Sequence, residues 1–456
     1  MWPLTSRISR PHRCVVPPQP DSKQKEPRPL LDLLTLHAAA PAVPAIDSFI
    51  TSTVSQSLKY LPLGVAGIIV WGLWLYRVVM SGIAKPIESD FRSSTSVIVP
   101  SYHEDPDILM RCLESWRAQD PTEIIIVLDV ADIVAYRRIV DLGDPRVFPI
   151  LFHHVGKRSA LGVGIREATG EILVLVDSDT SWEPGLLVNV QKPFADPLVG
   201  GVGTQQNVYQ RNSSLWRRVA DWLVTLRYYN YVPAMGRVGA VPCLSGRSAA
   251  YRRSAVLPVL DNLENEFFLG RRCIAGDDGR LTWLVLASGY KTVHQSSARA
   301  LSMFPAGFGA FIKQRVRWSR NSYRAYLTAI GKGWVWRVPF VTKITVLQIL
   351  LTPVTMGLTL WYVIFARLDF TALGIIFTIA FILIGRAIRG ASNLKRHPWD
   401  IFILPILAIA VIFVALPIKT YSFFTMNKQG WLTRHPDTIG GDGQNAASLM
   451  PEAVQL

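Results

Sequence analysis

Four long apolar runs divide the amino-acid sequence and constrain its fold more than any other feature. They cover residues 61–80, 343–365, 370–388 and 401–424. Each run has close to the length that a helix needs to cross the hydrocarbon core of a bilayer, roughly 20 residues. Between the first and second runs, residues 91–340 have ordinary polarity and alternate between strand-like and helix-like patterns. The sequence therefore predicts a soluble-type domain inserted between transmembrane helices.

The N-terminal region sets the expected orientation in the membrane. Residues 1–30 contain six basic residues, are rich in Pro and have no apolar periodicity, which predicts a disordered cytoplasmic tail. The first long apolar run comes too late for a secretory signal. Residues 31–58 are mildly apolar, and we expect either a weak span or an amphipathic interfacial helix. If 31–58 crosses the membrane, the central domain is cytoplasmic; the alternative is that the tail itself crosses.

The last apolar run is interrupted by Pro405 and Pro417. Each proline removes a backbone donor and disturbs a helix. We therefore expect 401–424 to follow a broken, re-entrant or interfacial path rather than a simple crossing. Two spans after the central domain return the chain to the cytoplasm, where this path leaves residues 431–434. The alternative is an ordinary kinked span with an external tail.

Charge and cysteine content narrow the range of partners. The formal net charge of +15 suits a protein that lies against an anionic leaflet or binds polyanionic nucleotides. The basic residues form no motif that reads nucleic acid, so we expect no nucleic-acid partner. The four cysteines, Cys14, Cys112, Cys243 and Cys273, have no paired spacing. We expect reduced thiols rather than disulfides or a metal site.

The central domain alternates strand patterns with helix patterns, which is typical of a parallel sheet in a Rossmann-like α/β fold. The expected strands are 96–99, 123–128, 147–152, 170–176 and 199–205, and the expected helices are 107–117, 131–140, 157–169 and 281–288.

The whole chain is divided on this basis into five parts. They are a disordered tail with a weak membrane segment (1–58), an N-terminal transmembrane segment (59–90), the α/β domain (91–303), interface helices (304–340) and a C-terminal transmembrane region that ends in a disordered tail (341–456). The interface helices are rich in Arg, Lys, Trp and Tyr, a composition expected of amphipathic helices at a membrane surface.

Polar side chains stand at the ends of three predicted strands. They are Tyr102 and Glu104, Asp129, and the pair Asp177 and Asp179. Because the carboxyl ends of parallel strands meet at one edge of a sheet, we expect these side chains to form a site. In an extended chain Asp177 and Asp179 point to the same side and can hold a divalent cation that clamps a diphosphate. The alternative is that one Asp caps the next segment.

Three further motifs carry candidate site residues. Lys157 begins a predicted helix, where it can reach a phosphate or a base, or simply face solvent. Ser245 and Gly246 lie in a loop that suits a ligand or an ordinary turn. Asp277 and Asp278 precede an apolar helix; such acids are either partners of the helix dipole or a general base.

The last motif is Gln314-x-x-Arg317-Trp318. Gln314 and Arg317 are three residues apart and therefore share a helix face. A membrane anchor explains the composition of this helix but not this particular combination.

In this order, the motifs resemble those of the family 2 processive glycosyltransferases. The matching segments are Val99-Pro-Ser-Tyr-His-Glu104, Asp177-Ser-Asp179, Gly276-Asp-Asp278 and Gln314-x-x-Arg317-Trp318. Hyaluronan, chitin, cellulose and Nod-factor chito-oligosaccharide synthases share this layout and its flanking membrane segments. The resemblance covers 95–340 well and the C-terminal part loosely, where Gly430-Trp-Leu-Thr-Arg434 is similar to a gating segment of hyaluronan synthases.

The resemblance implies a cytosolic GT-A domain and assigns roles to the motifs. It places the following residues around the donor nucleotide: Tyr102, Glu104, Asp129, Lys157, Asp177, Gln314, Arg317 and Arg434. Asp177 and Asp179 would act through Mg²⁺ or Mn²⁺, with Asp179 the more direct ligand. The acceptor side would comprise Ser245, Gly246 and Trp318, and Asp278, beside Asp277, would be the catalytic base.

The implied function is a membrane-embedded, processive, inverting glycosyltransferase. It would polymerise sugars from UDP-sugar donors into a polysaccharide, hyaluronan-like or another capsule polymer, and pass it across the plasma membrane as a multi-pass protein. Its partners would be the UDP-sugar, the growing chain and membrane lipid. The alternatives are a non-processive transferase that acts on a lipid carrier, and a transporter with a degenerate nucleotide domain.

Two departures from hyaluronan synthases leave the sugar open. Arg247 follows Ser245-Gly246 where those enzymes have Pro, and Arg280 stands one place later than usual after the acidic pair.

Overall fold

The computed structural model describes residues 64–153, 155–361 and 372–428. The predicted tail and weak membrane segment (1–58) and the segment 431–434, with Arg434, lie outside the described residues.

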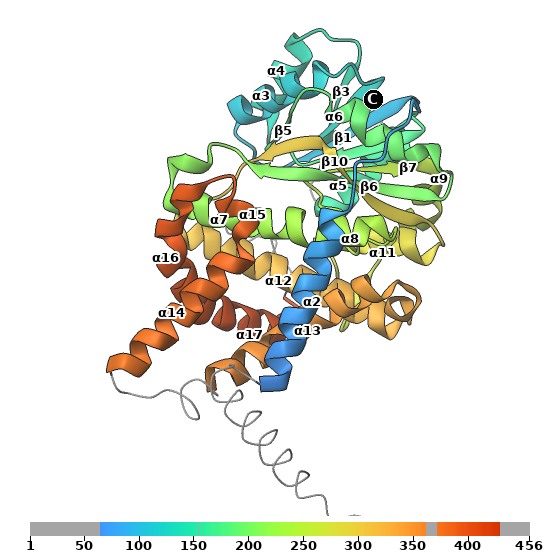
Figure 1. The fold of residues 1–456 in the computed structure, drawn as a ribbon. Coiled ribbons are helices and arrows are strands. Elements are labelled where there is room, and N and C mark those ends of the chain that lie inside the picture. Colours follow the sequence, from blue (N-terminus) through green and yellow to red (C-terminus); the bar gives the residue numbers. More distant parts are fainter. Residues whose placement is uncertain (1–63, 154, 362–371, 429–456) are drawn as a thin grey trace, which may run out of the picture. The chain divides into compact units, whose positions relative to one another are not determined.

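An eight-stranded mixed sheet forms the centre of the α/β domain (Figure 1). The strand order is β3-β2-β1-β4-β7-β6-β10-β5. The strands are β1 (Thr95–Ser101), β2 (Glu123–Asp129), β3 (Val147–Phe152), β4 (Ile172–Val176), β5 (Thr180–Trp182), β6 (Val199–Val208), β7 (Ser248–Arg252) and β10 (Lys291–Ser302), and a separate hairpin pairs β8 (Phe267–Phe268) with β9 (Arg271–Arg272).

The four strands predicted at the start of the domain are confirmed and run parallel as β1 to β4. The expectation of a wholly parallel sheet is wrong, because β7 lies antiparallel between β4 and β6 and β5 lies antiparallel to β10. β7 follows a loop that crosses the carboxyl edge of the sheet, so the chain re-enters the sheet in the opposite direction. This strand brings the loop before it, residues 243–247, beside the end of β4.

The sheet is covered on both faces, which explains why its strands are almost continuously apolar. Successive side chains alternate between the faces: Leu173 and Leu175 join one core, and Val174 and Val176 join the other. Helix α5 packs on the first face, and α3, which contains the buried Trp116, packs on the second.

The helices of the described residues are α2 (Gly64–Gly82), α3 (Pro106–Arg117), α4 (Ile133–Asp141), α5 (Lys157–Glu167), α6 (Leu186–Gln191), α7 (Leu215–Asn230), α8 (Val232–Arg237), α9 (Arg253–Val256), α10 (Leu260–Glu264), α11 (Asp277–Ala287), α12 (Phe308–Gly331), α13 (Phe340–Trp361), α14 (Ala372–Arg389), α15 (Ala391–Leu394), α16 (Leu404–Ile409) and α17 (Leu416–Phe424). Helix α3 shows how the sequence determines where a helix begins. Pro106 occupies its first turn, and Asp105 caps it by accepting hydrogen bonds from the backbone N–H groups of Asp107 and Ile108 at 2.8 and 3.2 Å.

Residues 61–80, 343–365 and 370–388 were expected to be spans, and 401–424 was expected to follow a broken, re-entrant or interfacial path. The described residues contain one helix that meets the requirements of length and hydropathy by itself. It covers Phe340–Leu358 in α13. The segments Pro398–Ile409 and Phe413–Phe424 meet them only as a pair, with a bend of 45° between them. The apolar helix Gly67–Gly82 is shorter. The number of spans therefore stays a prediction.

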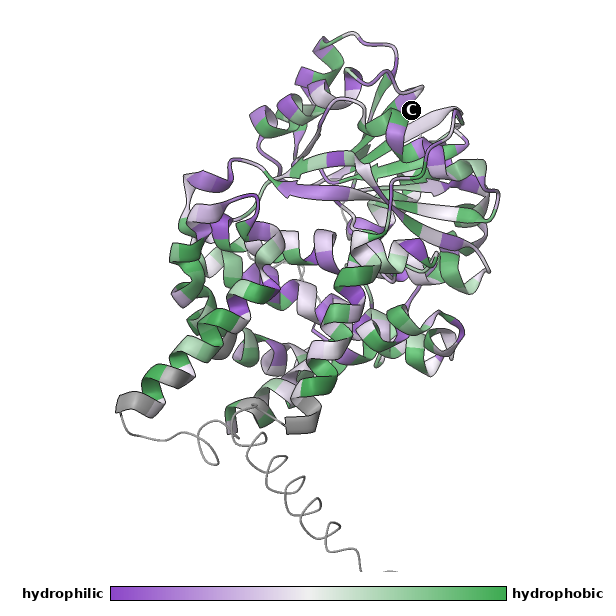
Figure 2. Ribbon diagram, viewed as in Figure 1, coloured by the Kyte–Doolittle hydropathy of each residue, from purple (hydrophilic) through white to green (hydrophobic). Residues whose placement is uncertain are grey.

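Apolar side chains project outward from several of these helices. Ile68 in α2, Val354 in α13 and Ile376 in α14 are each more than half exposed. Figure 2 shows that hydrophobic residues predominate along α2 and α14. Exposed apolar surface on this scale is unusual for a water-soluble protein and is expected where a helix meets lipid or a partner.

Candidate functional site

Three polar strand ends lie at the carboxyl edge of the sheet, as predicted. β2, β1 and β4 are parallel neighbours, so their carboxyl ends lie at the same edge. Asp129 is the last residue of β2, and Tyr102 and Asp177 directly follow β1 and β4. A hydrogen bond from Ser178 Oγ to Glu104 Oε2, 2.6 Å long, joins the segments that follow β4 and β1. The structure therefore brings these residues to one edge of the sheet, and their role as a site stays a prediction.

The local geometry of Asp177 and Asp179 differs from the prediction. β4 ends at Val176, and the next residues form a tight turn in which the Thr180 N–H donates to the Asp177 carbonyl at 3.0 Å. The end of the predicted strand is therefore confirmed, and the extended conformation assumed for the two carboxylates after it is wrong. The turn redirects the chain from β4, inside the sheet, to β5, which pairs antiparallel with β10 at an edge.

Lys157 lies at the first position of α5, between two carboxylates. Its Nζ is 2.7 Å from Asp177 Oδ1 and 3.1 Å from Asp277 Oδ2. Burial lowers the pKa of Lys157, but Asp177 and Asp277 outweigh that effect and leave the pKa above its ordinary value. Lys157 is therefore a permanent cation that joins the end of β4 to the start of α11.

The acidic pair occupies the first turn of α11, not the segment before a helix. Gly276, with φ of +78°, precedes the helix, which begins at Asp277 instead of the predicted residue 281. Asp278 Oδ1 accepts from the Gly279 N–H at 2.7 Å. Burial raises the pKa of Asp277, although Lys157 opposes the shift. Carboxylates at a helix N-terminus are favoured by the helix dipole, so this position stabilises both acids.

The loop before β7 closes over this cluster. A Cβ added to Gly246 would lie 3.1 Å from Lys157 Nζ and 3.2 Å from Asp277 Oδ2, so a side chain there would crowd both groups. Cys243 Sγ lies 3.6 Å from Asp278 Oδ2. Of the predicted loop residues, Gly246 is thus brought to the acidic pair, and Ser245 is its neighbour in the loop. The contact of Cys243 with Asp278 was not predicted.

Helix α12 carries Gln314, Arg317 and Trp318 to the same place. The charge of Arg317 interacts with Asp177, Asp179, Asp277 and Asp278, and these carboxylates partly offset the lowering of its pKa by burial. Gln314 is buried, and its Oε1 has no hydrogen-bond partner among the described residues. Trp318 contacts Phe304 edge-on, with ring centroids 6.0 Å apart.

Buried ion pairs behind the cluster were also missed. Arg158 donates to Glu266 Oε2 at 2.7 Å and to the Gly276 carbonyl at 3.2 Å. Arg280 Nε lies 3.2 Å from the other oxygen of Glu266. These contacts tie α5 to the start of α11. The sequence offered no signal for them, because the partners are far apart in the chain.

Two carboxylates, Asp177 and Asp179, are the predicted metal ligands. Among the described residues, no group of three or more His, Cys, Asp and Glu side chains is placed to hold a metal ion. Mg²⁺ is commonly bound by one or two carboxylates together with water and substrate phosphates. The pair therefore fits a cation that takes its remaining ligands from a substrate, and it does not fit an all-protein metal cage.

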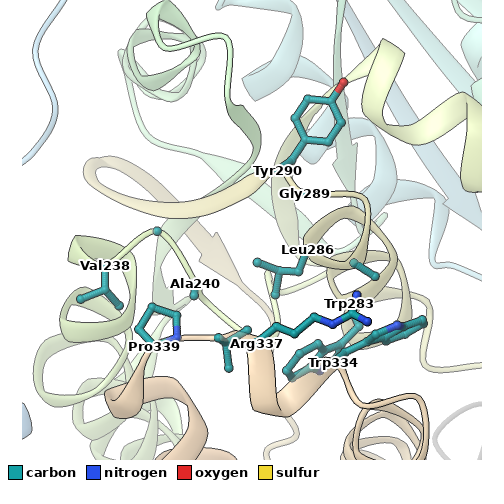
Figure 3. A pocket seen from close by; sticks show the side chains of 12 residues that line it. Val238, Ala240, Trp283, Leu286, Gly289, Tyr290, Trp334, Arg337 and Pro339 are labelled. Carbon is teal, nitrogen blue, oxygen red and sulfur yellow. The ribbon is translucent and has the colours of Figure 1, made fainter.

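A cavity of about 500 Å³ adjoins the site. Cys243 and Trp318 line it at the site, and its walls continue along α2, α7, α8, α12, α13, α16 and α17, for example at Thr345 and Ile418. A second cavity of about 320 Å³ lies beside α11 and contains none of the predicted site residues. There Arg337 runs alongside Trp334 and Trp283, below Leu286 (Figure 3).

Residues 92–321 match the family described as "Glycosyltransferase like family 2". The chain belongs to this family. A glycosyltransferase family 2 domain makes the protein a sugar-transferring enzyme, and it accounts for the mixed α/β sheet with its polar carboxyl edge.

Relatives of this family 2 enzyme match most of its length. An N-acetylglucosaminyltransferase of Rhizobium leguminosarum bv. viciae is 30% identical over 380 residues, which cover 81% of this chain and 88% of the relative. One of Sinorhizobium fredii is 31% identical over 77% of this chain and 86% of its own. Among solved structures, a mannosyltransferase of Pyrobaculum calidifontis, in complex with GDP-Man and Mn²⁺, superposes with a TM-score of 0.53 and 21% identity, over 76% of this chain and 96% of its own. This last similarity supports the GT-A-like fold.

Proposed function

We propose that the protein is a membrane-embedded, processive, inverting glycosyltransferase that builds a polysaccharide or oligosaccharide from UDP-sugar donors and passes it into the membrane. The proposal rests on the position of Cys243, which lies between the acidic pair and the cavity. Its thiol contacts Asp278, and the same residue lines the cavity between the helices. A sugar added beside Asp278 thus has an enclosed path away from the site.

In the proposed function, the UDP-sugar donor binds at the carboxyl edge of the sheet. Tyr102, Glu104 and Asp129 hold the uridine, and the diphosphate lies near Asp179. Because Lys157 already engages Asp177, Asp179 is the more direct ligand of a Mg²⁺ or Mn²⁺ ion. Such an ion, when bound, neutralises the diphosphate and stabilises the departing UDP. Gln314 and Arg317 hold the diphosphate from the opposite side, on α12.

The transfer step follows from the position of Asp278. The bond between the anomeric carbon of the donor and the β-phosphate oxygen of UDP breaks. The acceptor hydroxyl oxygen forms the new bond from the opposite face, and its proton passes to the Asp278 carboxylate. Lys157 and Arg317 stabilise the charge that develops on UDP, and fixed charges of this kind need little reorganisation. Asp277, held by Lys157, supports the cluster and does not take the proton.

In the proposed function, the acceptor sugar binds beside Trp318, Ser245 and Gly246. Trp318 offers an aromatic face at the mouth of the cavity, and Gly246 allows the acceptor to approach the acidic pair. The relatives named N-acetylglucosaminyltransferase favour UDP-N-acetylglucosamine as one donor. Arg434 and its segment would close the donor site from the cytoplasm.

Membrane embedding is supported by the exposed apolar faces of α2, α13 and α14. We propose a multi-pass protein of the plasma membrane with its catalytic domain in the cytoplasm.

The test is the length distribution of the product at low turnover, with the full chain in lipid nanodiscs and UDP-N-acetylglucosamine as the first donor. A processive enzyme makes long product chains at a time when most enzyme molecules have not yet begun a chain. Products that carry single added sugars, and that lengthen only as the donor is consumed, would instead favour a non-processive transferase that acts on a lipid carrier.

A further inference from the structure

Arg247 connects the turn after β4 with the Trp318 ring on α12. Its backbone carbonyl accepts a hydrogen bond from the Asp177 N–H at 3.2 Å, which fixes its backbone at the turn. Its guanidinium lies over the Phe304 ring at 4.1 Å from the centroid and over the Trp318 ring at 4.6 Å. One side chain therefore reaches from the end of β4, where the donor is proposed to bind, to the ring beside which the acceptor is proposed to bind.

The carboxylates of the turn act on the Arg247 guanidinium without pairing with it. Its charge interacts with Asp179 and Asp177. Phe304, which the guanidinium covers, follows Met303, and the Met303 N–H donates to the Asp179 carbonyl at 3.2 Å. The side chain is half-buried and forms no hydrogen bond or ion pair with any residue that the structure describes. Its N–H donors are therefore available to a ligand at this place.

The Trp318 ring is already covered in this structure. The guanidinium of Arg247 lies 4.6 Å from the ring centroid, and that of Arg315 lies 4.9 Å from it. Phe304 contacts the same ring edge-on, with centroids 6.0 Å apart. A sugar that stacks on an indole needs a free face of the ring. A guanidinium thus occupies the space where the proposed function requires an acceptor sugar.

Arg247 is the cation that can leave the ring. Arg315 also lies over Phe311, at 4.8 Å, and its Nε and Nη2 are buried. The Arg247 backbone is bonded to Asp177, so rotation of its side chain is enough to turn the guanidinium towards a diphosphate at the turn. A charged, two-pronged hydrogen bond to phosphate is stronger than the contact of a cation with a ring. A bound donor should therefore draw Arg247 away from Trp318.

We propose that Arg247 binds the donor diphosphate and, by leaving Trp318, makes a face of that ring available to the acceptor. The inference rests on the proposed function, to which it adds a donor-binding residue and a coupling between the two substrates. Arg247 stands where hyaluronan synthases have Pro, whose side chain has no donor. The coupling is therefore a property of this chain's own sequence and not of the shared motifs.

A packing role is the competing explanation. If Arg247 only holds Trp318 and Phe304 in place, its loss weakens the binding of one or both ligands but does not change how one ligand affects the other. The proposed role instead predicts that donor and acceptor strengthen each other's binding by the same factor, because coupling between two sites is reciprocal.

The experiment measures the affinity of the full-length protein, in lipid nanodiscs, for a tetrasaccharide of N-acetylglucosamine with and without UDP and Mn²⁺. The affinity for UDP with and without the tetrasaccharide completes the cycle. The variants are Arg247→Gln, Arg247→Lys and, as a matched control, Lys313→Gln, which removes an exposed charge from the helix that carries Trp318.

We expect UDP and Mn²⁺ to strengthen tetrasaccharide binding about fivefold or more in the wild type and in Lys313→Gln, the lower end of ordinary coupling between sites. Arg247→Gln should bind UDP about tenfold more weakly, because it lacks one charged hydrogen bond. Without UDP, this variant should bind the tetrasaccharide more tightly than the wild type does, a gain that lost packing does not produce. Arg247→Lys should restore part of the coupling.

Retention of the full coupling by Arg247→Gln, or a wild-type affinity for the tetrasaccharide that UDP and Mn²⁺ leave unchanged, would overturn the inference. A structure of the full-length protein with UDP and Mn²⁺ tests it without any acceptor. The Arg247 guanidinium should contact the diphosphate and lie away from Trp318, and a guanidinium that still covers the ring would overturn the inference.

Failure of the inference is distinct from failure of the proposed function. The function would stand in each of these cases, provided that the protein still releases UDP from a UDP-sugar. Absence of UDP release from all donors would reject the function itself.

Discussion

The ammonium group of Lys157 lies 2.7 Å from the carboxylate of Asp177 and thereby joins two motifs that are far apart in the sequence. The same group lies 3.1 Å from Asp277. It was expected near the uracil or the diphosphate; its observed partners are the carboxylates themselves. One cation therefore allows the turn after β4, where we propose that a metal binds, and the acidic pair, which we propose contains the base, to lie side by side.

Replacement of Lys157 by Met should reduce the transfer rate about 100-fold or more. The change leaves the buried Asp277 and the half-buried Asp177 without the cation that they share, and it removes a positive charge from the proposed transition state. The measurement is UDP release at saturating donor. Lys192→Met, which removes a lysine paired with Glu88, is the matched control and should keep the wild-type rate. Equal rates in the two variants would show that Lys157 has no role in the cluster.

The strand ends were predictable because a buried parallel strand appears in the sequence as an apolar run that ends at a polar residue. Asp129 and Asp177 were placed correctly by this rule. The start of α11 was misplaced by four residues because polar Asp277 and Asp278 look like loop residues, although a helix N-terminus favours them. The turn at Asp179 depends on where β5 pairs, and that pairing is not visible in the local sequence.

The arginines near Trp318 were the larger omission. Arg247 was noticed only as a departure from the usual Pro, and Arg315 was read as part of a basic interface helix. Their meeting depends on the docking of α12 against the loop before β7. Long-range contacts of this kind leave no periodic pattern in a single sequence.

Replacement of Asp179 by Ala should abolish both metal-dependent UDP binding and transfer, and excess chelator should have the same effect on the wild type. Asp179 lies in the turn after β4, and we propose that its carboxylate is the oxygen ligand that Mg²⁺ or Mn²⁺ needs there. UDP binding would be titrated with and without Mn²⁺. Asp196→Ala, which removes an exposed carboxylate paired with Lys291, should bind UDP normally. Full activity in chelator would refute the metal requirement.

His294 should make the folded state sensitive to mild acid. It is buried in β10, its Nε2 lies 3.3 Å from Gln205 Oε1, and burial lowers its pKa to about 4, below the ordinary value of 6.5. Between these two values the unfolded chain binds a proton that the folded chain does not, so stability falls as the pH drops from 6.5 towards 4.

The size of this effect is on the order of 3 kcal/mol. The thermal unfolding midpoint of the His294→Gln variant should depend less on pH over this range than that of the wild type. Identical slopes for the wild type and His294→Gln would contradict the assignment.

The most direct test of the account is UDP release by the full-length protein over a panel of UDP-sugars, compared with its Asp278→Asn variant. We predict that the wild type releases UDP from at least one donor in the presence of a divalent cation and an acceptor. The variant should bind UDP with unchanged affinity and transfer about 10² to 10⁴ times more slowly, because it lacks the base. Near-normal turnover by a folded Asp278→Asn variant, or no release from any UDP-sugar by the wild type, would contradict the account.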